Sequence, residues 1–222
     1  YGLFALRVET WNGLIFFCVD NDTDDLMTWL GDIPALCEGF PGPAELDYHD
    51  SFTINGAANW KTYCDNTVEG YHLSLVHPSL ARAVIADEIE IVPHDDGRMV
   101  AFHVKYEARG SSLRGADGLW IYRFPGFQAV LGDRGFKAER IEPVGPGRLR
   151  TDNWSWFGDL PEAERGSAFG WAQEIVHEDL GICEAVQRNL EAGVYHSGIL
   201  SPAHEGNTML FQNLVREAVN GE

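Results

Sequence analysis

The chain has 222 residues, of which 45% are hydrophobic and 23% are charged, and this is enough to bury a core in one domain. Its 16 basic and 34 acidic residues give a formal net charge of -18, which repels nucleic-acid phosphates and anionic lipid surfaces. Its apolar runs are all shorter than the roughly 18 residues of a membrane span. We therefore expect a soluble globular domain with neither nucleic acid nor membrane as a partner.

The four cysteines form neither a metal-binding pattern nor a disulfide pattern. Cys18, Cys37, Cys64 and Cys183 are scattered, without a C-x-x-C or C-x-H pair. This spacing supports neither a zinc ribbon, nor an iron–sulfur cluster, nor a disulfide framework. We therefore expect a reducing, cytoplasmic location. Because the chain starts at Tyr1 without a signal-peptide pattern, we also expect that it begins inside a longer protein.

The first part of the chain predicts a hairpin, a short helix and a strand. Residues 3–10 and 14–19 flank Asn12-Gly13, the strongest short signal for a β-hairpin. Helical spacing of apolar residues predicts a short helix at residues 26–30, and a strand is predicted at residues 46–54.

The remainder predicts a helix, a sheet and a longer helix. Residues 59–71 have helical periodicity, which Pro78 interrupts. Period-two alternation then predicts an antiparallel sheet of five successive strands, at residues 99–106, 119–124, 127–131, 136–142 and 149–157. A long helix between Pro161 and Gly193 closes the fold. We therefore expect an α+β domain.

One acidic residue of the long helix faces the predicted core. At roughly 100° per residue, Asp179 falls near the middle of the apolar stripe, whereas Glu178 lies at its edge and His177 points away. A carboxylate that faces a core is costly unless it is paired or bound to a metal. A structural interpretation therefore pairs Asp179 with an arginine or makes it cap a neighbouring element, and a metal site requires further ligands.

Such ligands occur at the end of the predicted helix 59–71. Glu69, His72 and His77 lie close together in sequence, and the two histidines converge only if the helix unwinds between them. Two imidazoles and one carboxylate can hold one face of a non-haem Fe(II) ion and leave positions open for O₂ and substrate. The same ligand types also serve zinc hydrolases.

Two segments resemble the iron-site motifs of a known family. Residues 59–72, NWKTYCDNTVEGYH, followed by Val76-His77-Pro78, resemble the iron-site motif in the catalytic domain of Rieske-type non-haem iron oxygenases. Residues 178–187 resemble the family's second signature, and residues 8–16 are similar to the stretch that joins its Rieske domain to its catalytic domain. The resemblance implies that His72, His77 and Asp179 are the iron ligands.

The resemblance also implies a fold and a domain organisation. The expected fold is a helix-grip (START-like) domain, with a curved antiparallel sheet around a long C-terminal helix. Residues 1–20 would be the tail end of a missing Rieske domain and the crossover, and residues 21–222 would be the mononuclear iron catalytic domain. The [2Fe–2S] cluster would then lie on the missing N-terminal domain and not on this chain.

The implied activity is O₂-dependent hydroxylation of an aromatic or quaternary-ammonium substrate, with N-demethylation in the second case. Glu69 takes the position of the bridging acid that links the iron site to the cluster of a neighbouring subunit. Glutamate at this position is more typical of the branch that oxidises quaternary ammonium compounds. The implied partners are a reductase or ferredoxin and further copies of the chain in a homotrimer. As a structural alternative, Glu69 is an ordinary surface carboxylate at a helix end.

Two other function classes remain open at this stage. A helix-grip cavity without a metal would make a non-catalytic START-like module that binds a hydrophobic ligand, and a bound zinc ion would make a hydrolase. Several sheet aromatics could line the cavity: Trp120, Tyr122, Trp154, Trp156 and Phe157. Asp65 and Asn66 could support the metal ligands through hydrogen bonds. Four histidines are interpreted as bystanders: His94, His103, His196 and His204.

Overall fold

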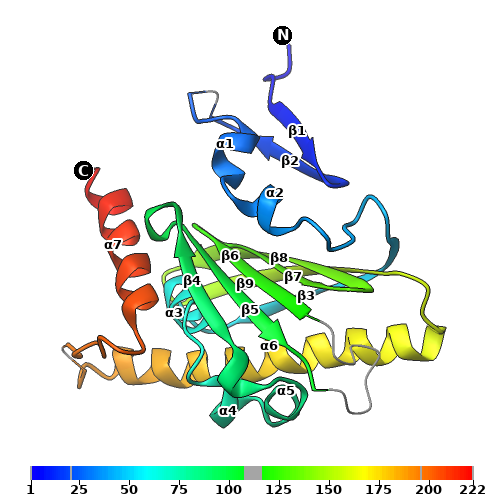
Figure 1. Ribbon diagram of the computed structural model, residues 1–222. Helices are drawn as coiled ribbons and strands as arrows, with labels where there is room; N and C mark the ends of the chain where they lie inside the picture. The colour runs from blue at the N-terminus through cyan, green and yellow to red at the C-terminus, as the bar shows by residue number, and fades with distance from the viewer. Residues whose placement is uncertain (1, 21, 108–116, 196, 222) are drawn as a thin grey trace.

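A computed structural model describes residues 2–20, 22–107, 117–195 and 197–221 (Figure 1). Seven antiparallel strands form the main sheet, in the order β3-β9-β8-β7-β6-β5-β4. Their bounds are β3 Asp47–Gly56, β4 Glu90–His94, β5 Met99–Lys105, β6 Asp117–Arg123, β7 Phe127–Gly132, β8 Gly135–Gly145 and β9 Arg148–Phe157. The five strands predicted to form an antiparallel sheet are confirmed as β5–β9, and the strand predicted at residues 46–54 is β3, which joins the same sheet.

The edge strand β4 was not predicted. It is five residues long and contains Pro93, which weakens the strand pattern. Proline lacks an N–H group for the ladder, and an edge position tolerates this loss.

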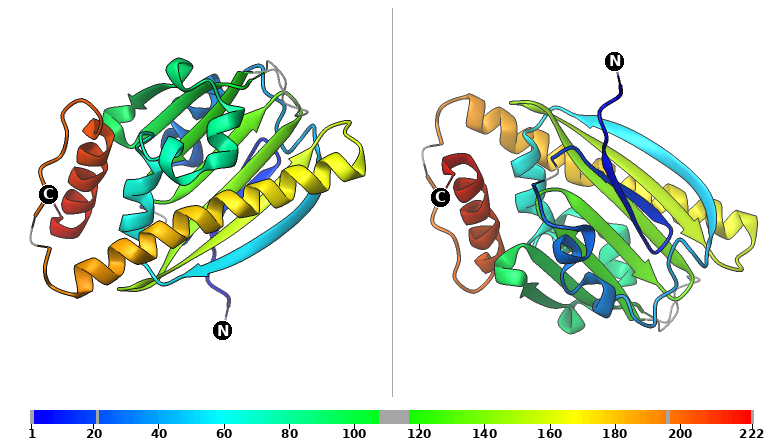
Figure 2. Two further views of the ribbon diagram at one scale, coloured as in Figure 1. Left: turned by 90° about the horizontal axis from the view of Figure 1, so that it is seen from below. Right: turned by 90° about the horizontal axis from the view of Figure 1, so that it is seen from above.

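A long helix lies across one face of the sheet. Helix α6, Glu162–Glu191, has 30 residues and buries Val176, Leu180 and Cys183, as Figures 1 and 2 show. The predicted antiparallel sheet with a long helix is therefore confirmed. The long helix is not the last element, because helix α7, Gly206–Asn220, follows it. Phe211 of α7 packs edge-on against Trp60, with ring centroids 6.0 Å apart.

The opposite face of the sheet is covered by the N-terminal part of the chain (Figure 2). The hairpin of β1, Arg7–Trp11, and β2, Leu14–Cys18, is followed by α1, Leu26–Leu30, and α2, Ile33–Leu36. Asn12 and Gly13 have φ of 49° and 80°, as a tight hairpin turn requires. Phe16 and Trp29 pack against each other and help to close this outer core.

The helix predicted at residues 59–71 is shorter in the structure. Helix α3 spans Trp60–Thr67, and α4, Leu73–Val76, and α5, Pro78–Ala83, follow it. Two short 3₁₀ helices, η1 Ala86–Glu88 and η2 Asp95–Gly97, flank β4. The interruption predicted at Pro78 is present, since His77 between α4 and α5 has the non-helical angles φ -115° and ψ 79°.

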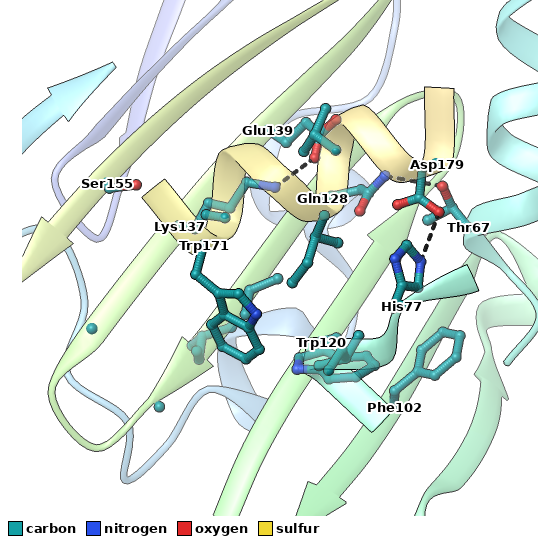
Figure 3. A pocket seen from close by; sticks show the side chains of 18 of the residues that line it. Thr67, His77, Phe102, Trp120, Gln128, Lys137, Glu139, Ser155, Trp171 and Asp179 are labelled. Atoms are coloured by element: carbon teal, nitrogen blue, oxygen red, sulfur yellow. Dashed lines mark hydrogen bonds and ion pairs between the residues drawn. The ribbon is translucent and has the colours of Figure 1, made fainter. Parts of the chain in front are cut away.

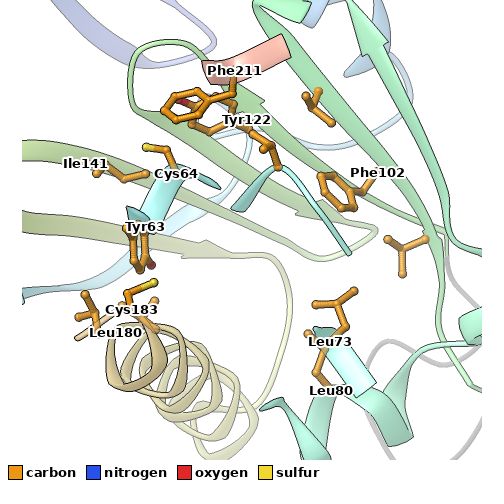
Figure 4. Close-up of a cluster of buried hydrophobic side chains, with 14 of the residues drawn as sticks. Tyr63, Cys64, Leu73, Leu80, Phe102, Tyr122, Ile141, Leu180, Cys183 and Phe211 are labelled. Carbon is orange, nitrogen blue, oxygen red and sulfur yellow. The ribbon is translucent and has the colours of Figure 1, made fainter. Parts of the chain in front are cut away.

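The inner core lies between the sheet and the helices (Figure 4). Its buried members include Tyr63 and Cys64 of α3, Tyr122 of β6, Cys183 of α6 and Phe211 of α7. All four cysteines fall within the described ranges and are free thiols. Among the helices of the described residues, none combines the length and the apolar composition needed to cross a membrane.

Candidate metal centre

Three elements bring two histidines and one aspartate together. His72 directly precedes α4, His77 lies between α4 and α5, and Asp179 is on α6. One ligand atom from each residue lies within 4.8 Å of the others. The break before Pro78 makes this possible, since an unbroken helix would point the two imidazoles apart.

Each histidine ring is held by a glutamate at one nitrogen and faces Asp179 with the other. His77 Nδ1 lies 2.8 Å from Glu178 Oε2, and its Nε2 lies 3.0 Å from Asp179 Oδ1. His72 Nδ1 bonds Glu69 Oε1, and its Nε2 lies 3.5 Å from Asp179 Oδ1. A carboxylate at Nδ1 fixes the proton there in a neutral imidazole and leaves the Nε2 lone pair for a metal.

Asp179 is held by a side chain of α3. Asn66 Nδ2 donates a hydrogen bond of 2.7 Å to Asp179 Oδ1, so the predicted contact of Asn66 with the ligands is present. Asp65 faces α7 instead, where Gln212 Nε2 donates to its Oδ2 at 3.3 Å. Burial raises the pKa of Asp65 to about 6, although the bond from Gln212 acts in the opposite direction.

Burial opposes the charged forms of these groups, but their mutual hydrogen bonds outweigh it. The bonds with Asp179 and Glu69 raise the pKa of His72 to about 9 despite burial. The pKa of His77 is also raised, since Asp179 and Glu178 outweigh the effect of burial. The pKa of Asp179 is lowered to about 2 because both histidines counteract burial. A divalent cation would have to displace protons from the imidazoles in order to bind here.

The residues fit a mononuclear transition-metal ion. Two imidazole nitrogens and one carboxylate oxygen converge, and the side chains of His72, His77 and Asp179 are 12%, 1% and 15% exposed. Three such ligands on one side of an ion would leave open positions on the other, as non-haem Fe(II) oxygenases require. Catalytic zinc sites also use three protein ligands with an open position.

A cavity of about 220 Å³ adjoins this group (Figure 3). Its walls come from the inner face of the sheet and from α6, and they are mainly apolar, with Phe102, Trp120 and Trp171 among them. This volume suits a small organic molecule, and a mainly apolar wall with a few polar groups is typical of ligand sites.

The predicted cavity aromatics divide between the two faces of the sheet. Trp120, Tyr122 and Phe157 line the cavity, as predicted. Trp154 and Trp156 pack in the outer core instead. They alternate with Ser155 and Phe157 along β9, so they point to the other face.

Glu69 is buried, with 9% of its surface exposed, and this excludes an ordinary surface carboxylate. Its Oε2 accepts the backbone N–H groups of Tyr71 at 2.7 Å and of His72 at 3.3 Å. The structure thus places Glu69 in direct contact with His72.

The roles of three charged residues were not predicted from the sequence. Glu178 was placed at the edge of the helix stripe without a function, and it orients His77. Lys137 and Glu139 line the cavity, and their spacing of two on a predicted strand could have indicated a shared face.

The histidines interpreted as bystanders lie away from the candidate group where they are described. His94 bonds Asp32 at 3.2 Å, and His204 lies beside Tyr71, with ring centroids 6.3 Å apart. His103 borders a second hollow at β4 and β5. His196 lies outside the described residues.

The fold and the site define a class of protein: an α+β domain with a candidate mononuclear metal group in the wall of a small cavity. Residues 43–221 match the family described as ring hydroxylating alpha subunit (catalytic domain), and the chain belongs to this family. The match favours a catalytic oxygenase domain over a non-catalytic binding module.

Curated relatives are similar over most of this chain. Choline monooxygenase, chloroplastic, of Arabidopsis thaliana is 26% identical over 96% of this chain and 55% of its own length. The carnitine monooxygenase oxygenase subunit of Escherichia coli (strain K12) is 24% identical over 87% of this chain and 54% of its own length. The chain thus spans about half the length of these relatives.

Solved structures show the same fold. The quaternary ammonium Rieske monooxygenase CntA superimposes with a TM-score of 0.82 at 20% identity, over 96% of this chain and 60% of that chain. Naphthalene 1,2-dioxygenase from Rhodococcus sp. gives a TM-score of 0.70 at 16% identity, over 95% of this chain and 65% of that chain.

Proposed function

We propose that this chain catalyses O₂-dependent hydroxylation of a small organic substrate at a mononuclear Fe(II) ion held by His72, His77 and Asp179. The observation that carries this proposal is the convergence of the three ligand atoms within 4.8 Å, with each histidine turned by its own glutamate. Membership of the ring-hydroxylating family supports iron over zinc.

When bound, Fe(II) supplies O₂ activation at its open positions. The protein's own contribution is positional. Glu69 and Glu178 keep a proton on Nδ1 of His72 and His77, and Asn66 fixes the carboxylate of Asp179. The apolar cavity walls exclude water and hold the substrate beside the three ligands.

The proposed substrate is a quaternary ammonium compound or an aromatic compound. Trp120, Trp171 and Phe102 offer aromatic faces in the cavity, and such faces attract ammonium cations. Relatives named choline monooxygenase and carnitine monooxygenase support the quaternary-ammonium class. Hydroxylation of an N-methyl group ends in demethylation, whereas an aromatic ring yields a cis-diol or a phenol.

Electrons would come from outside this chain. In this proposal residues 1–20 are the end of a Rieske domain and the crossover, residues 21–222 are the catalytic domain, and the [2Fe–2S] cluster lies on the N-terminal domain. Glu69 bridges the cluster of a neighbouring subunit in a homotrimer to His72, and a reductase or ferredoxin supplies the electrons. Insights into inter-subunit electron transfer are reported for the structure of a similar quaternary ammonium Rieske monooxygenase, and this supports the arrangement.

Two further features complete the proposal. A sheet packed against the long helix α6 supports the helix-grip (START-like) description of the fold. The cytoplasmic location stays a prediction from the sequence, and the plant relatives are named chloroplastic.

Anaerobic Fe(II) titration tests the ligand set. The parent chain should bind one iron, whereas His72→Ala, His77→Ala and Asp179→Ala should bind none tightly, because two ligands hold a labile divalent ion poorly. Glu174→Ala, an exposed position on the same helix, is the matched control. Full iron binding by Asp179→Ala would contradict the proposal.

A further inference from the structure

A charged pair occupies the apolar cavity on the side away from the metal ligands. Lys137 Nζ lies 2.8 Å from Glu139 Oε2, and these side chains are 17% and 2% exposed. Figure 3 shows the pair on one side of the cavity and His77 and Asp179 on the other. Stability alone does not explain the pair, because a buried ion pair can often be replaced by hydrophobic residues of similar size without loss of stability.

The two members of the pair differ in their freedom to bind a ligand. Both carboxylate oxygens of Glu139 are engaged, because Tyr63 Oη donates to Oε1 at 3.0 Å and Lys137 donates to Oε2. An ammonium group has three N–H donors, and within the described residues Lys137 directs one of them to Glu139. Glu139 and Tyr63 thus anchor the ammonium group, which keeps donors for a ligand.

A buried hydroxyl lies on the same wall of the cavity as the Lys137 side chain. Ser155 faces Lys137 across the β8–β9 ladder, so the two side chains are neighbours on the same face of the sheet. Ser155 is 2% exposed and lines the cavity. The ammonium group of Lys137, with its free donors, is suited to an anionic oxygen ligand, and the Ser155 hydroxyl adds a polar group to the same wall.

The charges of the cavity favour the same ligand. Among the described lining residues, Arg134 and Lys137 are cationic, and the anionic residues are Glu69, Glu139 and Asp179. Arg134 is 55% exposed and lies 4.0 Å from Asp133, so water screens its charge, whereas Lys137 is 17% exposed. Lys137 is therefore the cation best enclosed by the cavity, and a charge-assisted hydrogen bond from it to an anionic ligand is strong in this apolar environment.

We propose that Lys137, supported by Ser155, binds a carboxylate of the substrate and orients the opposite, oxidised end toward His72, His77 and Asp179. The substrate is then a small organic acid, either aromatic or with a quaternary ammonium group. Its status as a substrate rests on the function proposed above, whereas carboxylate binding does not.

The test compares molecules that differ at one end. One pair is 3-phenylpropionate and 3-phenylpropan-1-ol, and the second is 4-(trimethylammonio)butanoate and butyltrimethylammonium. Calorimetric titration of the metal-free chain and of the anaerobic Fe(II)-loaded chain measures binding without turnover. A charge-assisted hydrogen bond predicts that the acid in at least one pair binds about tenfold more tightly or better.

The main variant is Lys137→Met combined with Glu139→Gln. It removes both charges together, since Lys137→Met alone would leave a buried carboxylate without its cation. In this double variant the acid and its partner molecule should bind with about the same affinity. Lys105→Met is the matched control, because Lys105 pairs with Glu88 at the surface and is 57% exposed, and it should keep the parent preference.

Two outcomes would overturn the carboxylate site: no preference for the acid in either pair with the parent chain, or an unchanged preference in the double variant. This failure is distinct from failure of the proposed function. Iron binding with no acid preference removes the carboxylate site alone, and an acid preference without iron binding removes the proposed function alone.

Discussion

Removal of the Glu178 carboxylate should weaken iron binding without abolishing it. Glu178 bonds His77 Nδ1 at 2.8 Å, and His77 is 1% exposed, so few other groups can orient the ring. Loss of a carboxylate that supports a ligand histidine generally costs about 10- to 100-fold in metal affinity. Because Glu178 is itself 24% exposed, water screens part of its charge, and we expect the lower end, about tenfold in Glu178→Ala, or about 1.4 kcal/mol.

The assay is anaerobic Fe(II) titration against a competing chelator at fixed pH. The parent chain, Glu178→Ala, Glu178→Gln and the exposed control Glu174→Ala should all bind one iron at saturation. Glu178→Gln keeps a neutral acceptor and should fall between the parent and Glu178→Ala. Unchanged affinity in Glu178→Ala would refute the positioning role, and loss of all iron would make Glu178 a ligand in place of Asp179.

The remaining predictions concern pH, electron transfer and packing. In the metal-free chain the pKa of His72 is raised from 6.5 to about 9. The protonated imidazole therefore stabilises the fold fully below pH 6.5, and this stabilisation is lost as the pH rises through about 9. Calorimetry should show that the Tm falls over this range, and Asp179→Asn should make the fall smaller. In a protein with the proposed Rieske domain, Glu69→Gln should keep iron and cluster but slow single-turnover electron transfer, and equal rates would exclude the bridging role. Phe211→Ala should lower the free energy of unfolding, measured in urea, by about 3–5 kcal/mol, because Phe211 is 2% exposed and packs on Trp60 and Tyr122. A loss below about 1 kcal/mol would show that the packing of α7 contributes little to the stability of the fold.

Two local patterns made His72, His77 and Asp179 candidates, and the resemblance to the family motifs then implied that they are the ligands. Helical phase separates Asp179 from Glu178 on one helix, and the proline after His77 predicts the break that lets the histidines converge. The role of Glu178 could not be predicted in the same way. Phase gives the direction of its side chain, whereas its partner His77 comes from a segment about a hundred residues away.

The assignment of strand faces was harder because both faces of this sheet are covered. Alternation correctly places Trp154 and Trp156 on one face of β9 and Ser155 and Phe157 on the other. Tertiary packing decides which pair of side chains points toward α6, because neither face of the sheet is exposed to water. The same ambiguity hid Lys137 and Glu139, whose strand pattern is equally compatible with an outward orientation.

The position of the candidate ligands along the chain has a consequence for folding. Between His77 and Asp179, which are 102 residues apart, lie six of the seven strands of the main sheet. An ion that binds both residues cross-links the ends of a chain segment that contains most of the sheet. Bringing the ends of so long a segment together costs chain entropy. Because an ion that binds only the folded chain stabilises it by mass action, iron should act as a clamp on α6, and amide hydrogens of that helix should exchange more slowly when iron is bound.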